Sequence, residues 1–275
     1  MRKIKRLTLT LCLLAMGLAA SAQPTPRHKL APTPPMGWMT WNLFKGDISD
    51  QLIRETADAM VENGFVEAGY KYIFIDDLWQ GGRDRHNNII PDPKKFPHGI
   101  KALADYVHSK GLKLGIYSDA AQLTCGGWTA SLGFEEQDAR TFASWGIDYL
   151  KYDYCNAPED SATARRRYKR MADALQHSGR DIVLGICEWG QRQCEEWCES
   201  VGGQLWRTSY DVRDMWKDIV GQGGMGILDI VNVTAPIAHN ARHGQWPDMD
   251  MLVVGLNGTG GPSSDLGGVG CTYVE

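Results

Sequence analysis

Short apolar runs alternate with amphipathic helical segments along the chain from residue 36 onward. Apolar or aromatic runs of this length, bounded by turn residues, are typical of buried strands. The pattern predicts seven strands, over residues 36–41, 72–77, 112–119, 149–155, 182–189, 205–211 and, with the weakest apolar pattern, 249–254.

The segments between these strands repeat their apolar residues every three to four positions, as one face of a helix does. Ser49 is the expected N-cap of the first helix, and Gly64, Gly111 and Gly179 are expected to end three of them. The apolar faces comprise Leu52, Ile53, Ala57, Met60 and Val61, then Ile100, Leu103, Ala104 and Val107, then Tyr168, Met171 and Leu175.

Strand and helix units that repeat about 35 residues apart predict a parallel sheet, either doubly wound or closed into a barrel. A dinucleotide-binding sheet would carry G-x-G-x-x-G after its first strand, and no such motif follows Trp41. We therefore predict an α/β fold of the (β/α)8 TIM-barrel class, with about seven βα units in this chain.

The first 22 residues carry cations, then an apolar run, then Ala20-Ser21-Ala22, a pattern typical of a secretory signal peptide. We expect residues 1–22 to be removed, leaving 23–275 as one catalytic barrel domain that is incomplete at its C-terminal end. No later stretch reaches the roughly 18 apolar residues of a membrane span. The sequence therefore predicts a secreted or periplasmic protein with no membrane partner.

The net charge is −4 and charged residues make up 23% of the chain, so there is no basic field to attract nucleic acid. All cysteines but Cys12 lie beyond residue 22, and they are even in number, as expected where disulfides persist. Because no paired C-x-x-C spacing occurs, disulfides are favoured over zinc. These cysteines are Cys125, Cys155, Cys187, Cys194, Cys198 and Cys271.

Polar and aromatic residues gather at the C-terminal ends of the predicted strands. In a parallel barrel these ends meet at one rim, where the loops build the active site. Asp119 could cap a helix, but carboxylates after nearly every strand favour a binding site. The residues are Trp41, Asp76, Asp77, Tyr117, Asp119, Asp153, Glu188, Asp211, Asp248 and Asp250.

The run YLKYDYCN, residues 149–156, holds the first candidate for chemistry. Because side chains alternate along a strand, Lys151 and Asp153 share one face and Tyr152 and Tyr154 take the other. A buried lysine beside Asp153 would keep the carboxylate ionised by lowering its pKa, as a nucleophile requires. Lys151 could instead form a Schiff base in an aldolase-type barrel, although pairing with Asp153 would keep it protonated.

Carboxylates and aromatic rings with few cations suit a neutral sugar better than a phosphate ester. Glycoside hydrolysis commonly uses two carboxyl groups, about 5–5.5 Å apart when configuration is retained. Asp211, at the end of the sixth strand, is the best partner for Asp153. His239 and His243 are spaced as helical metal ligands are, but no third ligand supports them, so neither a metal nor a cofactor is expected.

Seven motifs resemble, in order and spacing, those of glycoside hydrolase family 27, the α-galactosidase (melibiase) family. They are PPMGWMTWN, YIFIDDLW, GLKLGIYSD, YLKYDYCN, CEWG, LWRTSYDV and WPDMDML. The resemblance extends from about Thr33 to the C-terminus. It implies a retaining hydrolase that releases terminal α-linked galactose, with Asp153 as the nucleophile and Asp211 as the general acid/base.

The resemblance also implies a disulfide and a galactose-binding set. Cys125 and Cys155 are expected to pair, as these two motif positions do in the family. Glu188 and Asp76 keep the galactosidase form, whereas family members for N-acetylgalactosamine and arabinopyranose differ at these positions. The implied substrate-binding residues are Trp41, Asp76, Asp77, Tyr117, Lys151, Glu188, Arg207 and Asp250.

Two local features depart from the family pattern. The loop after CEWG reads QRQCEEWCES, where Cys194 and Cys198 match no family disulfide, and W-P-D-M-D-M replaces the usual W-N-D-P-D-M. Two alternatives stay open: an inactive or sugar-binding fragment, or an enzyme for a related sugar such as β-L-arabinopyranose. The sequence indicates neither the natural aglycone nor the oligomeric state, and it leaves the pairing of the other cysteines open.

Overall fold

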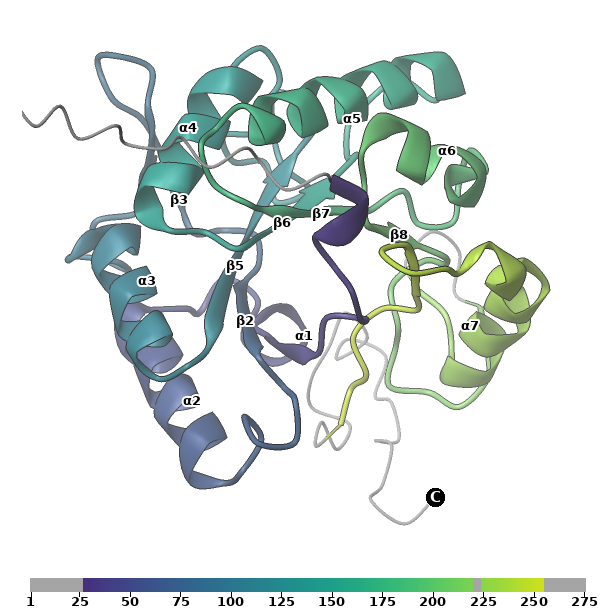
Figure 1. Cartoon of the computed structure of the whole chain (residues 1–275), viewed down its shortest axis with the longest axis horizontal. Helices are drawn as coiled ribbons and strands as arrows, with labels where there is room; N and C mark the ends of the chain where they lie inside the picture. Colours follow the sequence, from purple (N-terminus) through teal and green to yellow (C-terminus); the bar gives the residue numbers. More distant parts are fainter. Residues whose placement is uncertain (1–26, 220–223, 255–275) are drawn as a thin grey trace, which may run out of the picture.

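A computed structural model describes residues 27–219 and 224–254 of the chain (Figure 1). The predicted signal peptide and Cys271 lie outside these ranges. In chain order the elements are η1 (Arg27–Lys29), β1 (Gly37–Met39), α1 (Trp41–Phe44), α2 (Asp50–Glu62), β2 (Tyr72–Ile75), β3 (Gln80–Arg83), β4 (Ile89–Pro91), α3 (Gly99–Ser109), β5 (Lys113–Asp119), α4 (Glu135–Trp145), β6 (Tyr149–Asp153), α5 (Ser161–Gln176), β7 (Val183–Ile186), α6 (Cys194–Val201), β8 (Leu205–Arg207), α7 (Ile227–Thr234), η3 (Ala235–Asn240) and β9 (Trp246–Asp248).

The main sheet has seven strands in the order β1-β2-β5-β6-β7-β8-β9, and every neighbouring pair is parallel. Figure 1 shows the sheet curling as part of a barrel wall, with α2, α3, α4 and α5 along its outside. The predicted class, a (β/α) barrel with about seven units, is therefore confirmed. Because all strands run the same way, their carboxyl ends lie at one rim.

The position of the seventh strand was predicted wrongly. The strand is β9, Trp246–Asp248, rather than residues 249–254. Asp250 has a φ of +74°, which an L-residue in a strand does not adopt. Pro247 lacks an N–H for the ladder, and it is tolerated because β9 pairs with β8 alone in the described sheet.

The helix predictions follow from the local sequence and are largely confirmed. Ser49 caps α2, and its hydroxyl accepts a hydrogen bond of 3.1 Å from the Leu52 amide. The predicted face of α2 is buried at Ile53, Ala57 and Met60, whereas Val61 is exposed. The helices α3 and α5 bury the faces expected for them.

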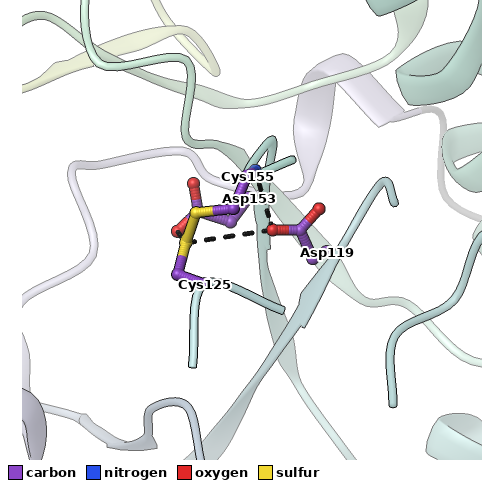
Figure 2. A group of neighbouring side chains, drawn as sticks. All are labelled: Asp119, Cys125, Asp153 and Cys155. Atoms are coloured by element: carbon purple, nitrogen blue, oxygen red, sulfur yellow. Dashed lines mark hydrogen bonds between the residues drawn. A yellow bond between two sulfur atoms is a disulfide. The ribbon is translucent and has the colours of Figure 1, made fainter. Parts of the chain in front are cut away.

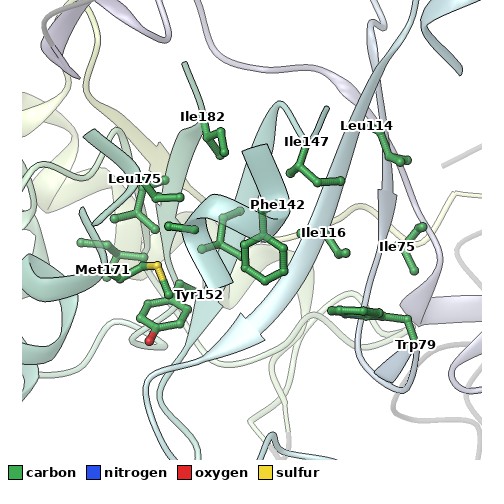
Figure 3. Close-up of a cluster of buried hydrophobic side chains, with 14 of the residues drawn as sticks. Ile75, Trp79, Leu114, Ile116, Phe142, Ile147, Tyr152, Met171, Leu175 and Ile182 are labelled. Atoms are coloured by element: carbon green, nitrogen blue, oxygen red, sulfur yellow. The ribbon is translucent and has the colours of Figure 1, made fainter. Parts of the chain in front are cut away.

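Two layers of apolar side chains fix the sheet. The outer layer lies between the strands and the helices (Figure 3) and includes Leu150 and Tyr152 of β6. The inner layer fills the concave side with Tyr72, Phe74, Tyr149, Val183 and Leu205. Each fully buried large side chain contributes about 1.5–3 kcal/mol. This alternation places Lys151 and Asp153 on the concave face, as predicted.

No helix in the described ranges is both long and apolar enough to cross a bilayer. The segment that begins with η1 is bonded to residues near the sheet by two side-chain hydrogen bonds. Arg27 Nε donates to the Gly202 carbonyl at 2.6 Å, and Trp246 Nε1 donates to the Ala31 carbonyl at 2.8 Å. Ala31 also belongs to the inner apolar layer.

Candidate active site

Asp153 occupies the last position of β6, and its side chain is almost completely buried. Its Oδ1 accepts a hydrogen bond of 2.9 Å from the Tyr154 amide, and its Oδ2 accepts one of 3.0 Å from the Tyr117 hydroxyl. Burial raises the pKa of Asp153 to about 6, against the opposing charge of Lys151. Two donors thus fix both oxygens of a carboxyl group that stays near its titration point at mildly acidic pH.

Lys151 does not pair with Asp153, contrary to the sequence prediction. Its Nζ lies 2.8 Å from Asp76 Oδ2, and it reaches that oxygen over the ring of Tyr117, whose centroid is 5.4 Å away. Burial lowers the pKa of Lys151, but the negative charges of Asp76 and Asp153 help to offset this, and the pKa lies well above its ordinary value. A permanently protonated lysine is a poor Schiff-base nucleophile, which disfavours the aldolase alternative.

The two aspartates after β2 are held in different ways. Asp76 Oδ1 accepts from the Asp77 amide at 2.8 Å, and the Asp76 amide donates to Thr40 Oγ1 at 3.0 Å. Thr40 directly precedes Trp41, the half-buried first residue of α1, so these contacts tie the start of α1 to the end of β2. Asp77 Oδ2 accepts from the Gly126 amide at 2.8 Å, which ties it to the loop after β5.

Arg207, at the end of β8, joins two further predicted residues. One nitrogen, Nη2, lies 2.6 Å from Asp211 Oδ1 and 2.7 Å from Asp250 Oδ2. Asp250 Oδ2 also accepts from the Val212 amide at 2.7 Å, and burial raises the pKa of Asp250 to about 6. The buried guanidinium of Arg207 therefore links the loop after β8, through Asp211, to the loop after β9, through Asp250.

The pKa of Asp211 is set by burial and by two neighbouring cations. Partial burial does raise the pKa of Asp211, but the charges of Arg207 and Lys151 outweigh it and lower the pKa below its ordinary value. The side chain remains 39% exposed, so solvent and ligands can reach it. In the ligand-free site Asp211 therefore stays ionised to lower pH than Asp153 does.

Glu188 follows β7 and is completely buried. Its Oε2 lies 2.6 Å from Arg192 Nη1, whereas Oε1 has no hydrogen-bond partner among the described residues. Burial raises the pKa of Glu188 to about 7, against the opposing charge of Arg192. The prediction placed Glu188 in the site but gave no role to Arg192.

Cys125 and Cys155 form a disulfide, as predicted, and it stands directly beside the carboxyl group of Asp153 (Figure 2). The buried Asp119 lies behind it, where Oδ2 accepts a hydrogen bond of 2.9 Å from the Cys155 amide. Asp119 is therefore not a helix cap, since α4 begins only at Glu135. Burial, with the charge of Asp153, raises the pKa of Asp119 well above its ordinary value.

The remaining cysteines of the described chain are free and buried. The Cys194 and Cys198 thiols donate to the Arg207 and Leu205 carbonyls, each at 3.4 Å, so they pack α6 on β8 rather than pair with one another. Cys187 Sγ accepts from Arg207 Nη1 at 3.6 Å. Burial raises the pKa of all three thiols, which keeps them unreactive.

Asp119, Asp153 and the two disulfide cysteines form a cluster that brings together oxygen and sulfur atoms of the kinds that can bind a metal ion. Its sulfur atoms are joined to each other, so they offer no thiolate ligand. His239 belongs to no such cluster in the described ranges, and its ring nitrogen Nδ1 lies 2.9 Å from the Pro236 carbonyl.

A cavity of about 590 Å³ opens beside Asp211, between the loops that follow β6, β7 and β8. Both disulfide cysteines border it, so it also adjoins the loop after β5. The sequence reasoning missed most of this wall, because loop residues carry no periodic signal. It is lined by Cys125, Tyr154, Cys155, Asn156, Ala157, Glu159, Trp189, Gln191, Arg192, Tyr210 and Asp211.

Asp153 and Asp211 at one rim, among further carboxylates and aromatic rings, supply the two carboxyl groups that glycoside hydrolysis commonly uses. The family model for alpha galactosidase A matches residues 33–265. The chain belongs to the alpha galactosidase A family. This confirms the family predicted from the seven motifs.

Similar proteins agree with this membership. Alpha-galactosidase A of Cellvibrio japonicus is 47% identical over 245 residues, a region that covers 88% of this chain and 59% of that protein. Alpha-galactosidase I from Mortierella vinacea has a crystal structure with a TM-score of 0.80 and 40% identity, covering 84% of this chain and 62% of that one.

A structure of α-galactosidase from Saccharomyces cerevisiae with raffinose gives a TM-score of 0.80 at 37% identity, covering 84% of this chain and 55% of that one. The chain thus spans between half and two thirds of the length of these family members.

Proposed function

We propose that this chain is a retaining α-galactosidase that releases terminal α-linked galactose from oligosaccharides or polysaccharides. The observation that carries the proposal is the pairing of a fully fixed, buried Asp153 with an accessible Asp211 at one barrel rim. Family membership supports the choice of sugar. The disulfide and the signal-like residues 1–22 support export to the periplasm or the medium.

The reaction takes two displacements. In the first, an ionised Asp153 oxygen bonds to the anomeric carbon while Asp211 gives its proton to the departing glycosidic oxygen. In the second, Asp211 takes a proton from water, the water oxygen bonds to the anomeric carbon, and the bond to Asp153 breaks. The anomeric configuration is retained, and both carboxyl groups return to their starting states.

One proton on the carboxyl pair is enough to begin this cycle. In the ligand-free site Asp153, whose pKa is about 6, takes up a proton at higher pH than Asp211, which Arg207 helps to keep ionised. The first step therefore requires the proton to pass to Asp211 when the substrate is bound. A sugar that displaces Asp211 from Arg207 Nη2 would raise the pKa of Asp211 and favour this transfer.

The other rim residues hold the galactosyl ring in this proposal. Asp76 and Asp77 accept hydrogen bonds from hydroxyls at the far edge of the ring, including the C6 arm, and Glu188 and Arg207 address the 2-position. A ring hydroxyl would supply the partner that Glu188 Oε1 lacks. The full set is Trp41, Asp76, Asp77, Tyr117, Lys151, Glu188, Arg207 and Asp250.

The test is turnover of nitrophenyl α-D-galactoside by the purified chain, with Asp153→Ala as the matched control and nitrophenyl β-L-arabinopyranoside as the competing substrate. We expect release from the galactoside only, with α-galactose as the first-formed anomer in an NMR time course. Release no faster than by Asp153→Ala, or β-galactose formed first, would overturn the proposal. Faster release from the arabinopyranoside would replace galactose by that sugar.

A further inference from the structure

Arg192 lies in the loop between β7 and α6 and has a left-handed backbone conformation, which residues other than glycine rarely adopt. Its φ is +57°, and Trp189 and Gln193 in the same loop have φ values of +52° and +53°. Side chains with a Cβ are strained in this left-handed region. Because three residues of this loop adopt a disfavoured backbone conformation, contacts with the rest of the protein must hold the loop in this conformation.

The contacts of Arg192 tie together three separate segments. Its Nε donates to the Glu159 carbonyl at 2.8 Å, and its guanidinium carbon lies 4.9 Å from the centre of the Tyr154 ring, both in the loop after β6. Its own carbonyl accepts from Trp197 Nε1 of α6 at 2.8 Å. The contacts of the side chain therefore fix the position of the guanidinium group.

The third contact of the side chain is the ion pair with Glu188. Nη1 lies 2.6 Å from Oε2, and the exposed fraction is 15% for the arginine side chain and 0% for the glutamate. Because Oε1 has no partner in the described chain, Arg192 supplies the hydrogen bond and the counter-charge of this carboxylate. Without it, Glu188 would be a buried acid with neither oxygen bonded.

We propose that Arg192 is a positioning residue that fixes the orientation of Glu188 toward the sugar, and thereby sets selectivity for galactosides with a free 2-hydroxyl. The inference rests on the proposed function, in which Glu188 addresses the ring 2-position. Arg192 fixes Oε2 and leaves Oε1 as the acceptor for the ligand. Arg192 also lines the cavity beside Asp211, the proposed general acid/base.

The experiment compares three variants on two substrates. Arg192→Gln removes the charge, Arg192→Lys keeps it, and Arg165→Gln removes a nearby surface arginine that packs on Trp197 without contacting Glu188. The substrates are nitrophenyl α-D-galactoside and its 2-deoxy analogue. The readout is the ratio of their kcat/KM values, which a general loss of folding would leave unchanged.

We expect Arg192→Gln to lower this ratio by about 10-fold to 100-fold, as the loss of a charge-assisted hydrogen bond predicts. The loss should be confined to the galactoside, Arg192→Lys should restore most of the ratio, and Arg165→Gln should match the parent chain. Equal losses on both substrates, or no recovery with lysine, would overturn the inference.

Calorimetric binding of galactose and 2-deoxygalactose separates this inference from the proposed function. If the parent chain binds galactose more tightly and Arg192→Gln removes that preference, the inference holds even where turnover is absent. If Arg192→Gln keeps the full preference for galactose, or the parent chain shows none, Arg192 does not act through the 2-position.

Discussion

Lys151 places its ammonium nitrogen 2.8 Å from Asp76, across the ring of Tyr117, although Asp153 lies only two residues away on the same face of β6. The lysine thus bridges β6 to the end of β2 and skips the intervening strand β5. Asp153 is left to Tyr117 and to the Tyr154 amide. Burial raises the pKa of Asp153 to about 6, and the charge of Lys151, which pairs with Asp76, offsets this only in part.

The first prediction concerns Asp153 as the nucleophile. Asp153→Ala should lose activity on nitrophenyl α-galactoside by at least about 10³-fold, because no other group can form the covalent intermediate. Azide or formate should restore part of the activity, with β-configured product, since the small anion enters the space that the carboxylate leaves. The measurement is initial rate with and without azide, followed by NMR of the product.

Two results would contradict this role. Near-parental activity of Asp153→Ala is one, and rescue that gives an α-configured product is the other. Asp119→Asn is the matched control, because Asp119 is also a buried acid at the end of the neighbouring strand β5. It should not be rescued by azide.

The second prediction separates the acid/base role of Asp211 from a binding role. Asp211→Asn should slow the hydrolysis of raffinose by about 10²-fold to 10⁴-fold, because its sugar leaving group needs a proton. The loss on nitrophenyl galactoside should be smaller in the first step, since nitrophenolate departs without one. Paired kcat/KM values on the two substrates test this, and equal losses would assign Asp211 to binding alone.

The sequence predicts the rim well because strand alternation and strand ends are local properties. Lys151 and Asp153 face inward, and Asp211 follows β8, as the period of two and the polar ends indicate. The partner of Lys151 could not be predicted in this way. It depends on how far a long side chain reaches across a curled sheet, which no spacing within one strand reveals.

The loops were the second limit of prediction. The strands of the hairpin formed by β3 and β4 are too short to show an alternating pattern, and Arg192 carries no turn signal despite its left-handed backbone. A departure from the family motif, QRQC after CEWG, was the signal that could have marked this loop as specialised. Its meaning required the contact between Arg192 and Glu188.

The third prediction is that the fold is more stable at mildly acidic pH than at neutral pH. The folded chain raises the pKa of Asp153 and Asp250 to about 6 and that of Glu188 to about 7, whereas ordinary values are near about 4. Between these limits the folded chain binds more protons than the unfolded chain. The free energy of unfolding therefore falls as pH rises from about 4 to about 7.

Thermal unfolding of the parent chain and of Glu188→Gln checks this. The parent Tm should drop between about pH 5 and about pH 7.5, and the variant should show a smaller drop, since one of the three groups no longer titrates. Glu136→Gln serves as the control, because that glutamate is on the surface of α4. A parent Tm that rises over this range, with the three carboxyl groups intact, would contradict the assigned pKa shifts.

The last prediction concerns the disulfide, whose position links stability to catalysis. Cys125 and Cys155 are 30 residues apart in sequence, and closing a loop of that length contributes about 3–4 kcal/mol by chain entropy. The Cys155 amide also donates to Asp119, and Cys155 follows Asp153 by two residues. Reduction should therefore loosen the end of β6 before the rest of the barrel unfolds.

Activity and near-ultraviolet circular dichroism, followed together during titration with a reductant, measure this order of events. Activity should fall while the dichroism signal of the buried aromatic layers persists, because most of the side chains in those layers come from strands and helices other than β6. The double variant Cys125→Ser, Cys155→Ser should start at the lowered activity and should not respond to the reductant. If activity and tertiary signal were instead lost together, the disulfide would stabilise the whole barrel without a separate effect on Asp153. An unchanged activity after complete reduction, shown by alkylation of both cysteines, would remove the disulfide from the account of the active site altogether.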